Sequence, residues 1–113
     1  MFIFQIVTAN VIYLDDNLFS HVKTNTSVVS FFEDDCELCN EFALTFYDVS
    51  DSFDGAQFFE VNCDKYPDFC KQYSIKSFPS VRFISNKTTH KYKGHRDSDS
   101  LKLWIEFMLK PVL

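Results

Sequence analysis

The sequence predicts an α/β fold, with helices covering a central mixed sheet of four to five strands. Short apolar segments rich in β-branched and aromatic residues, typical of buried strands, recur along the chain of 113 residues. Segments with apolar residues at helical spacing lie between them. Their order, strand–helix–strand followed by strand–strand–helix, favours a sheet sandwiched by about four helices, with right-handed crossovers joining its parallel strands.

The first third of the chain predicts two strands separated by a helix. The run Val11–Leu14 is typical of a short strand. Asp15-Asp16 suit the N-cap and the negative first turn of a helix that continues to about Val22. After a loop at 23–26, the apolar run Val28–Phe32 predicts a buried central strand.

The middle of the chain predicts one long helix. Apolar residues recur near helical spacing from Asn40 to about Phe53. We expect this helix to end near Gly55, because glycine readily adopts the left-handed conformation of a C-terminal cap. An apolar strand, a brief helix and another apolar strand should follow at 56–63, 68–73 and 80–84.

The last third predicts a hairpin and a helix. Asn86 and Lys87 suit a tight turn into a strand at 90–93, which Gly94 ends. The final helix is expected at Asp97–Leu109, because acidic residues lie at its positive end and its apolar residues share one face. Those apolar residues are Leu101, Trp104, Ile105, Met108 and Leu109.

Length and composition exclude several classes of function. The chain is long enough for one domain but not for two, and we assign residues 10–113 to a single domain. A net charge of −5 without a basic cluster argues against a nucleic-acid partner. No apolar run approaches the ~18 residues needed to span a bilayer, and a phosphate-binding glycine loop is absent from a chain with two glycines. We therefore expect a monomer without a membrane span or a cofactor.

Residues 1–9 fit two interpretations. They are apolar and end in Val7-Thr8-Ala9, which suits signal-peptidase cleavage, although the segment lacks a positively charged start. The same residues would also serve as a first β-strand. The sequence leaves the choice between a secretory signal and a strand open.

Two cysteines lie where the strand at 28–32 turns into the long helix, in the motif Cys36-Glu37-Leu38-Cys39. The first N–H groups of a helix lack intrahelical partners and the helix dipole is positive there, so a thiolate is stabilised. Two thiols at this spacing can close a small disulfide, and thiolate attack can reopen it. The pattern predicts thiol–disulfide exchange, with Cys36 as the nucleophile and Cys39 as the resolving sulfur.

Further motifs follow the two cysteines in a fixed order. They are Val61-Asn62-Cys63-Asp64, Tyr73-Ser74-Ile75-Lys76-Ser77-Phe78-Pro79-Ser80, Tyr92-Lys93-Gly94-His95-Arg96 and Trp104. With these motifs, nearly the whole chain resembles the thioredoxin superfamily, and within it the thioredoxin-like domains of protein disulfide isomerases. The resemblance implies a thioredoxin-like fold and a cis Phe78–Pro79 peptide bond facing the cysteines, which is plausible because only an X-Pro bond makes the cis form inexpensive.

The resemblance also implies roles for residues around the cysteines. Phe78 and Pro79 would contact the substrate, whose extended chain would pair with the backbone beside the proline. Arg96 aligns with a family arginine that lowers the pKa of the second cysteine, the alternative being a solvated loop arginine. Two further roles are expected from side-chain chemistry and not from the resemblance. Leu38 offers either an apolar substrate contact or simple packing, and Glu37 would modulate the cysteine pKa through its charge.

Cys63 and Cys70 form a second pair. Similar cysteines pair in some disulfide-isomerase domains, so the resemblance favours a structural Cys63–Cys70 disulfide over two free core thiols. Closing so short a loop would stabilise the fold by roughly 2–3 kcal/mol, and the bond would require an oxidising compartment. Zinc binding by the four cysteines is disfavoured, because the second spacing is too long and the pairs lie on different kinds of element.

Several positions depart from the family pattern. Asp34 and Asp35 replace a proline and a tryptophan, and Glu37-Leu38 replace the glycine–histidine pair of disulfide isomerases. Ser30 replaces a buried carboxylate that relays protons to the second cysteine, and Leu44 replaces a helix-kinking proline. One carboxylate about 6 Å from a sulfur costs the thiolate about 0.7 kcal/mol in water and about 2.8 kcal/mol at an effective dielectric of ~20. We therefore predict a weaker oxidant than a domain with the glycine–histidine pair.

Three functions remain open at this stage. The first is a thiol–disulfide oxidoreductase of the disulfide-isomerase type, in the endoplasmic reticulum lumen or secreted, with cysteine-containing client proteins and an unidentified redox partner. The second is a non-catalytic thioredoxin-like chaperone or adaptor whose CxxC pair is a stable disulfide. The third is a cytosolic thioredoxin-like reductant, favoured if residues 1–9 are a strand and Cys63 and Cys70 are reduced.

Overall fold

A computed structural model describes residues 10–111, so both interpretations of residues 1–9 lie outside the described part of the chain. Five strands and four helices alternate in the predicted order. In sequence they are β1 (Val11–Tyr13), α1 (Phe19–Thr24), β2 (Ser27–Phe32), α2 (Glu37–Ser50), β3 (Gln57–Asn62), α3 (Pro67–Gln72), β4 (Ser80–Ser85), β5 (Thr88–Lys91) and α4 (Ser98–Leu109).

The strands form one mixed sheet with the order β1-β3-β2-β4-β5. Strands β1 and β2 both run parallel to β3, whereas β4 is antiparallel to β2 and β5 is antiparallel to β4. Parallel neighbours need a crossover connection, which α1 and α2 supply, and the antiparallel pair β4–β5 needs only a tight turn. The predicted thioredoxin-like α/β fold is therefore confirmed.

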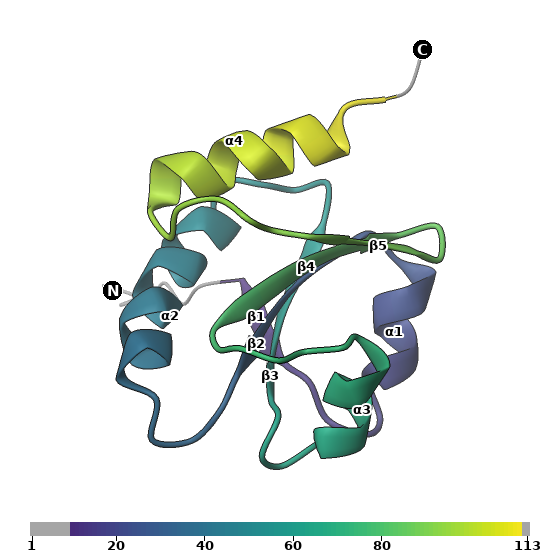
Figure 1. Cartoon of the computed structure of the whole chain (residues 1–113). Coiled ribbons are helices and arrows are strands. Elements are labelled where there is room, and N and C mark those ends of the chain that lie inside the picture. Colours follow the sequence, from purple (N-terminus) through teal and green to yellow (C-terminus); the bar gives the residue numbers. More distant parts are fainter. Residues whose placement is uncertain (1–9, 112–113) are drawn as a thin grey trace, which may run out of the picture.

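Helices cover both faces of the sheet, with α1 and α3 on one side and α2 and α4 on the other (Figure 1). Alternation along β2 explains the two layers, because successive side chains of a strand point to opposite faces. Val29 and Phe31 pack in the cluster that includes α1 and α3, whereas Val28 packs in the cluster that includes α2 and α4. Both faces of the central strand are buried, as its unbroken apolar run predicts.

The predicted start of the first helix at Asp15 is wrong. The Asn17 N–H donates to the Asp15 carboxylate at 3.0 Å, and the Leu18 N–H donates to the Asp15 carbonyl at 2.9 Å. These bonds form a local turn, and helix α1 begins only at Phe19. Aspartate side chains stabilise turns by the same chemistry that makes them N-caps, so the sequence pattern fits either structure.

The end predicted for the long helix is wrong. Helix α2 begins at Glu37 with Cys36 as its N-cap, in agreement with the predicted place of the cysteines at the helix start, but it ends at Ser50. Gly55 does not cap it, and neither glycine of the chain has a positive φ. The Asp51 and Ser52 N–H groups donate to carbonyls three residues earlier, which closes the helix without a left-handed residue.

The hairpin turn lies where the sequence predicts it, and its strand begins earlier than predicted. Asn86 and Lys87 have φ values of 51° and 66°, the left-handed conformations that a two-residue hairpin turn requires. A turn this short lets pairing resume at once, so β5 covers Thr88–Lys91 and ends before Gly94. None of the helices within residues 10–111 is long and apolar enough to cross a bilayer.

Candidate active site

The two cysteines of the CxxC motif lie at the start of α2, directly after the loop that leaves β2. Cys36 is the N-cap residue, in extended conformation, and its Sγ accepts a hydrogen bond from the Cys39 N–H at 3.1 Å. A disulfide joins the two residues, with their Cα atoms 5.2 Å apart. The sulfur thus occupies the position at which a helix terminus stabilises negative charge.

The two cysteines differ in solvent exposure, which limits the role that each sulfur can take. Cys36 is half-buried, whereas Cys39 is 4% exposed. Only the first cysteine is accessible enough to attack a sulfur of another molecule or to be attacked by one. Glu37 is exposed and Leu38 is 56% exposed, so both side chains border the approach to Cys36.

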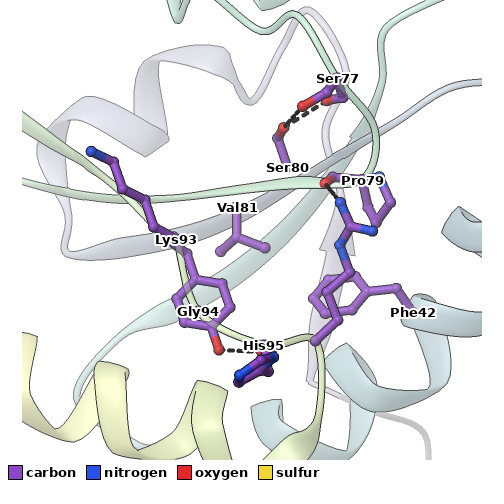
Figure 2. Close-up of a pocket in the computed structure, with 10 residues that line it drawn as sticks. Phe42, Ser77, Pro79, Ser80, Val81, Lys93, Gly94 and His95 are labelled. Atoms are coloured by element: carbon purple, nitrogen blue, oxygen red, sulfur yellow. Dashed lines mark hydrogen bonds between the residues drawn. The ribbon is translucent and has the colours of Figure 1, made fainter.

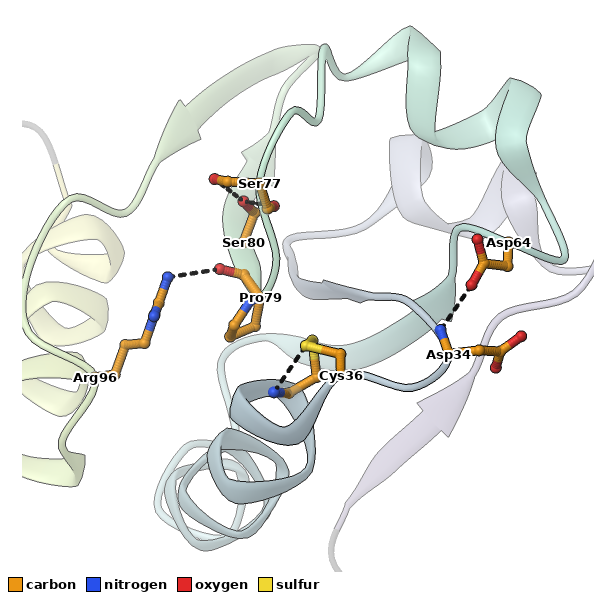
Figure 3. Close-up of a disulfide and its surroundings, with 8 residues drawn as sticks. Asp34, Cys36, Asp64, Ser77, Pro79, Ser80 and Arg96 are labelled. Atoms are coloured by element: carbon orange, nitrogen blue, oxygen red, sulfur yellow. Dashed lines mark hydrogen bonds between the residues drawn. A yellow bond between two sulfur atoms is a disulfide. The ribbon is translucent and has the colours of Figure 1, made fainter.

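The Phe78–Pro79 peptide bond is cis, and Pro79 points toward the disulfide from the start of β4 (Figure 3). The Ser80 hydroxyl donates to the Ser77 carbonyl at 2.6 Å, which closes the turn around the proline. The Arg96 guanidinium donates to the Pro79 carbonyl at 3.3 Å. The structure therefore brings together the cysteines, the proline and the arginine that the sequence marks, and it places the arginine on the proline carbonyl.

A hollow of about 460 Å³ borders this proline (Figure 2). Its lining joins Phe42 of α2 to the segment that contains Lys93 and Arg96. Two cationic side chains therefore border it, although the chain as a whole carries a net charge of −5.

The acidic loop before Cys36 is bound to the end of β3. The Asp34 N–H donates to the Asp64 carboxylate at 2.7 Å, and the Asn62 amide donates to the Asp34 carboxylate at 2.9 Å. Figure 3 shows the Asp34 carboxylate turned away from the disulfide. Asp35 has a φ of 53°, a left-handed conformation that aspartate tolerates better than most residues. We call this set of contacts among Asp34, Asn62 and Asp64 the loop clamp.

A second disulfide joins Cys63, which directly follows β3, to Cys70 of α3, with their Cα atoms 5.7 Å apart. The two residues are 7% and 4% exposed and belong to the core cluster on the α1 and α3 side of the sheet. Burial shields this bond from a large thiol reagent. Within the described residues, no cluster of three His, Cys, Asp or Glu side chains suits a metal ion.

The sequence reasoning missed Glu60, a buried acid next to α2. This residue of β3 is 4% exposed, and the Tyr47 hydroxyl donates to its Oε1 at 2.6 Å. Burial raises the pKa of Glu60, and hydrogen bonds from Tyr47 and Tyr13 offset part of that effect. A single charge inside the apolar run Phe58-Phe59-Glu60-Val61 is the signal that could have identified it.

A protein-family model described as Thioredoxin matches residues 10–107. The chain is 27% identical over 99 residues to a Thioredoxin domain-containing protein 5 homolog from Drosophila melanogaster, covering 84% of this chain and 24% of that protein. It is 29% identical over 111 residues to a probable protein disulfide-isomerase A6 from Medicago sativa, covering 89% of this chain and 30% of that protein. The chain thus spans less than a third of the length of each.

Two solved structures share the fold. The J-Trx1 fragment of ERdj5 superposes with a TM-score of 0.82 at 23% identity, covering 88% of this chain and 50% of that one. The zinc-bound form of human ERp44 superposes with a TM-score of 0.81 at 21% identity, covering 88% of this chain and 32% of that one. At these identities the structural likeness establishes the fold alone.

Proposed function

This chain belongs to the thioredoxin family, and from that membership we propose that it is a thiol–disulfide oxidoreductase of the disulfide-isomerase type. One observation carries the proposal. The CxxC pair is a disulfide at the N-terminus of α2, with an accessible first sulfur and a buried second one. Sequence similarity to a probable protein disulfide-isomerase supports the same reading.

The proposed reaction proceeds through a mixed disulfide. The Cys36 thiolate attacks a disulfide of a client protein, forms an S–S bond to one client sulfur and releases the other as a thiolate, which takes a proton from solvent. Cys39 then loses its proton and attacks the Cys36 sulfur, so the client becomes a dithiol and the pair becomes a disulfide. Run in reverse, the same steps oxidise a client dithiol.

The residues around the pair take the following roles in this proposal. The backbone beside Phe78 and Pro79 binds the extended client chain by strand-like hydrogen bonds, and the exposed Leu38 side chain contacts apolar client residues. Arg96 anchors the Pro79 carbonyl in the resting state and lowers the pKa of Cys39 when it turns toward the sulfur. Glu37 opposes formation of the Cys36 thiolate through its negative charge.

The two disulfides support the client class and the compartment in this proposal. Client proteins contain cysteines, and a separate redox partner restores the CxxC pair after each cycle. A buried structural disulfide between Cys63 and Cys70 supports an oxidising compartment, the endoplasmic reticulum lumen or the cell exterior, over the cytoplasm.

Insulin reduction tests the activity. The wild-type domain should accelerate precipitation of the insulin B chain by dithiothreitol, and Cys36→Ala should abolish the acceleration. In cells, Cys39→Ala should accumulate mixed disulfides with client proteins, because the resolving sulfur is absent, and Cys36→Ala/Cys39→Ala should accumulate none. A folded wild-type domain that neither reduces insulin nor traps clients would contradict the proposal.

A stable disulfide in a binding module is the second candidate, and the acidic residues around Cys36 favour it. Glu33, Asp35 and Glu37 flank the sulfur in sequence, and negative charge near a thiolate disfavours the reduced state. A CxxC disulfide that resists glutathione and dithiothreitol in the folded domain would select this candidate.

A further inference from the structure

A buried carboxylate lies on the side of the sheet that faces the CxxC helix. Glu60 of β3 pairs in register with Ser30 of β2, and its side chain is 4% exposed. Phe59 and Val61 belong to the core cluster on the opposite face, so the alternation of the strand turns Glu60 toward α2. Its Oε1 accepts the hydrogen bond from Tyr47 at 2.6 Å.

Glu60 and the resolving cysteine line the same small cavity. Cys39, Ala43 and Tyr47 are four residues apart along α2, so they lie on one face of the helix. All three line a cavity of about 80 Å³ to which β2 contributes the short Ser30 side chain and β3 contributes Glu60. A cavity of this size with polar groups in its lining has room for a water molecule. Glu60 and Cys39 therefore share a cavity across which a proton can pass by way of water.

The groups around Glu60 favour proton exchange over a fixed charge. Tyr13, Cys39 and Tyr47 are the other titratable residues that line the cavity, and no lysine or arginine is among its described lining residues. Burial raises the pKa of Glu60, and the two tyrosine hydroxyls lower it by a smaller effect. Burial also raises the pKa of Tyr47, which keeps its hydroxyl a donor. A carboxyl group with a raised pKa takes up and releases protons closer to neutral pH.

Cys39 needs such a group, because its sulfur must lose a proton before it can attack. A cysteine that is 4% exposed has little access to bases in solution, and a thiol with the ordinary pKa of about 8.5 is mostly protonated at neutral pH. Ser30, directly across from Glu60, cannot ionise to serve this purpose.

We propose that Glu60 is the proton acceptor and donor for Cys39, a role that rests on the oxidoreductase function proposed above. In the closing step, the Glu60 carboxylate takes the Cys39 thiol proton while the Cys39 sulfur bonds to the Cys36 sulfur. The bond between Cys36 and the client sulfur breaks, its electron pair leaves with the client thiolate, and solvent protonates that thiolate. In the reverse direction, protonated Glu60 returns the proton to Cys39 as it leaves.

The test measures how fast the Cys36–Cys39 disulfide closes. Reduced protein is mixed with oxidised glutathione at concentrations where closure limits the rate. The reaction is quenched at intervals, and the products are identified by mass spectrometry. The series is repeated over roughly pH 5 to 9, which spans ordinary carboxyl and thiol pKa values. Glu60→Gln should slow closure at neutral pH by about tenfold or more, and its rate should follow thiol ionisation alone. Glu41→Gln, on an exposed part of α2, is the matched control and should behave as wild type.

A second measurement separates this proposal from the function on which it rests. In a Cys39→Ala background, Glu60→Gln should leave the rate of mixed-disulfide formation between Cys36 and glutathione unchanged. If the Cys39→Ala protein forms no mixed disulfide, the oxidoreductase function fails. If it does form one, and Glu60→Gln with Cys39 present closes at the wild-type rate and with the wild-type pH profile, the role of Glu60 alone is overturned.

Tyr47→Phe keeps the carboxylate and removes its hydrogen-bond donor. Loss of that bond should raise the pKa of Glu60 further, because the bond favours the ionised form. The pH midpoint of closure should therefore move upward, a change that a structural role of the tyrosine would not produce. Should Glu60→Gln fail to fold by circular dichroism, this profile decides, and an unmoved midpoint overturns the proposal.

Discussion

Glu37 and Glu60 place two carboxylates at α2 in opposite environments, the first exposed to solvent and the second buried. Glu37 lies in the exposed first turn of the helix, next to Cys36. Glu60 lies on β3, where its side chain is buried and accepts a hydrogen bond from the hydroxyl of Tyr47. Solvent screens the first charge, and burial raises the pKa of the second carboxyl group. The same functional group therefore has different consequences for the two cysteines.

Removing the charge of Glu37 should make Cys36 more reactive. A charge about 6 Å away costs a thiolate about 0.7 kcal/mol in water, which corresponds to about a threefold change in thiolate population. Glu37→Gln should therefore raise the rate of Cys36 alkylation by iodoacetamide in the reduced protein by at least about threefold at neutral pH and low salt. Glu41→Gln, one turn further along the helix, should change it less. Equal rates in all three proteins would show that the charge of Glu37 does not influence Cys36.

Glu60 should make the stability of the fold depend on pH. Its pKa is raised in the folded chain, so the folded state holds this proton more tightly than the unfolded state does. The stability that it contributes is complete below the unfolded pKa and is lost as pH rises through the folded pKa. Glu60→Gln cannot ionise and avoids this loss. Its free energy of unfolding, relative to wild type, should therefore improve between pH 4 and pH 7 in urea titrations, and a pH-independent difference would contradict the assignment.

At the scale of elements, α2 and α4 depend on each other for burial. Leu101 and Ile105 of α4 are fully buried in the cluster that contains Phe46 and Val49 of α2. The opposite face of α4 exposes Leu103 and Phe107, at 67% and 70%. One stripe of this helix therefore fixes the position of the CxxC helix against the sheet.

Truncations on the two faces of α4 should have unequal costs. Ile105→Ala should lower the free energy of unfolding by about 2–5 kcal/mol, because it leaves a cavity in a packed core. Leu103→Ala, on the same helix with an exposed side chain, should change it by no more than about 0.5 kcal/mol. Urea unfolding followed by tryptophan fluorescence measures both. Similar losses in the two variants would mean that α4 is buried differently.

At the scale of the whole molecule, the two disulfides should open in sequence. Cys36 is half-buried, whereas Cys63 and Cys70 are both buried in the core. Mild dithiothreitol should reduce the first pair in the folded protein and leave the second intact until denaturant is added. Replacing Cys63 and Cys70 with alanine should lower the free energy of unfolding by roughly 2–3 kcal/mol. Alkylation and peptide mass analysis after graded reduction would reveal any simultaneous opening of both pairs.

Sequence periodicity and one motif predicted most of the fold. The strand Val28–Phe32 and the apolar face of α4 were legible because burial repeats at the period of each element. The start of α1 was not, because Asp15 satisfies a turn with the same carboxylate that would cap a helix.

The partnership between Glu60 and α2 was hidden for another reason. It depends on the register between β3 and β2 and on the helix that crosses above them, and no local pattern encodes either. The Cys36 N-cap bond is likewise a property of the folded turn. Sequence therefore predicted a chemistry for the cysteines, and three-dimensional placement was needed to find Glu60.

The loop clamp connects the loop before the Cys36–Cys39 disulfide to the segment that carries Cys63. Asn62 and Asp64, which bind the backbone and carboxylate of Asp34, are the immediate chain neighbours of Cys63. Opening the Cys63–Cys70 disulfide would therefore loosen the loop that leads to Cys36. A strongly reducing environment would act on this domain in two ways. It would open the Cys36–Cys39 disulfide directly, and it would loosen the preceding loop by opening the Cys63–Cys70 disulfide.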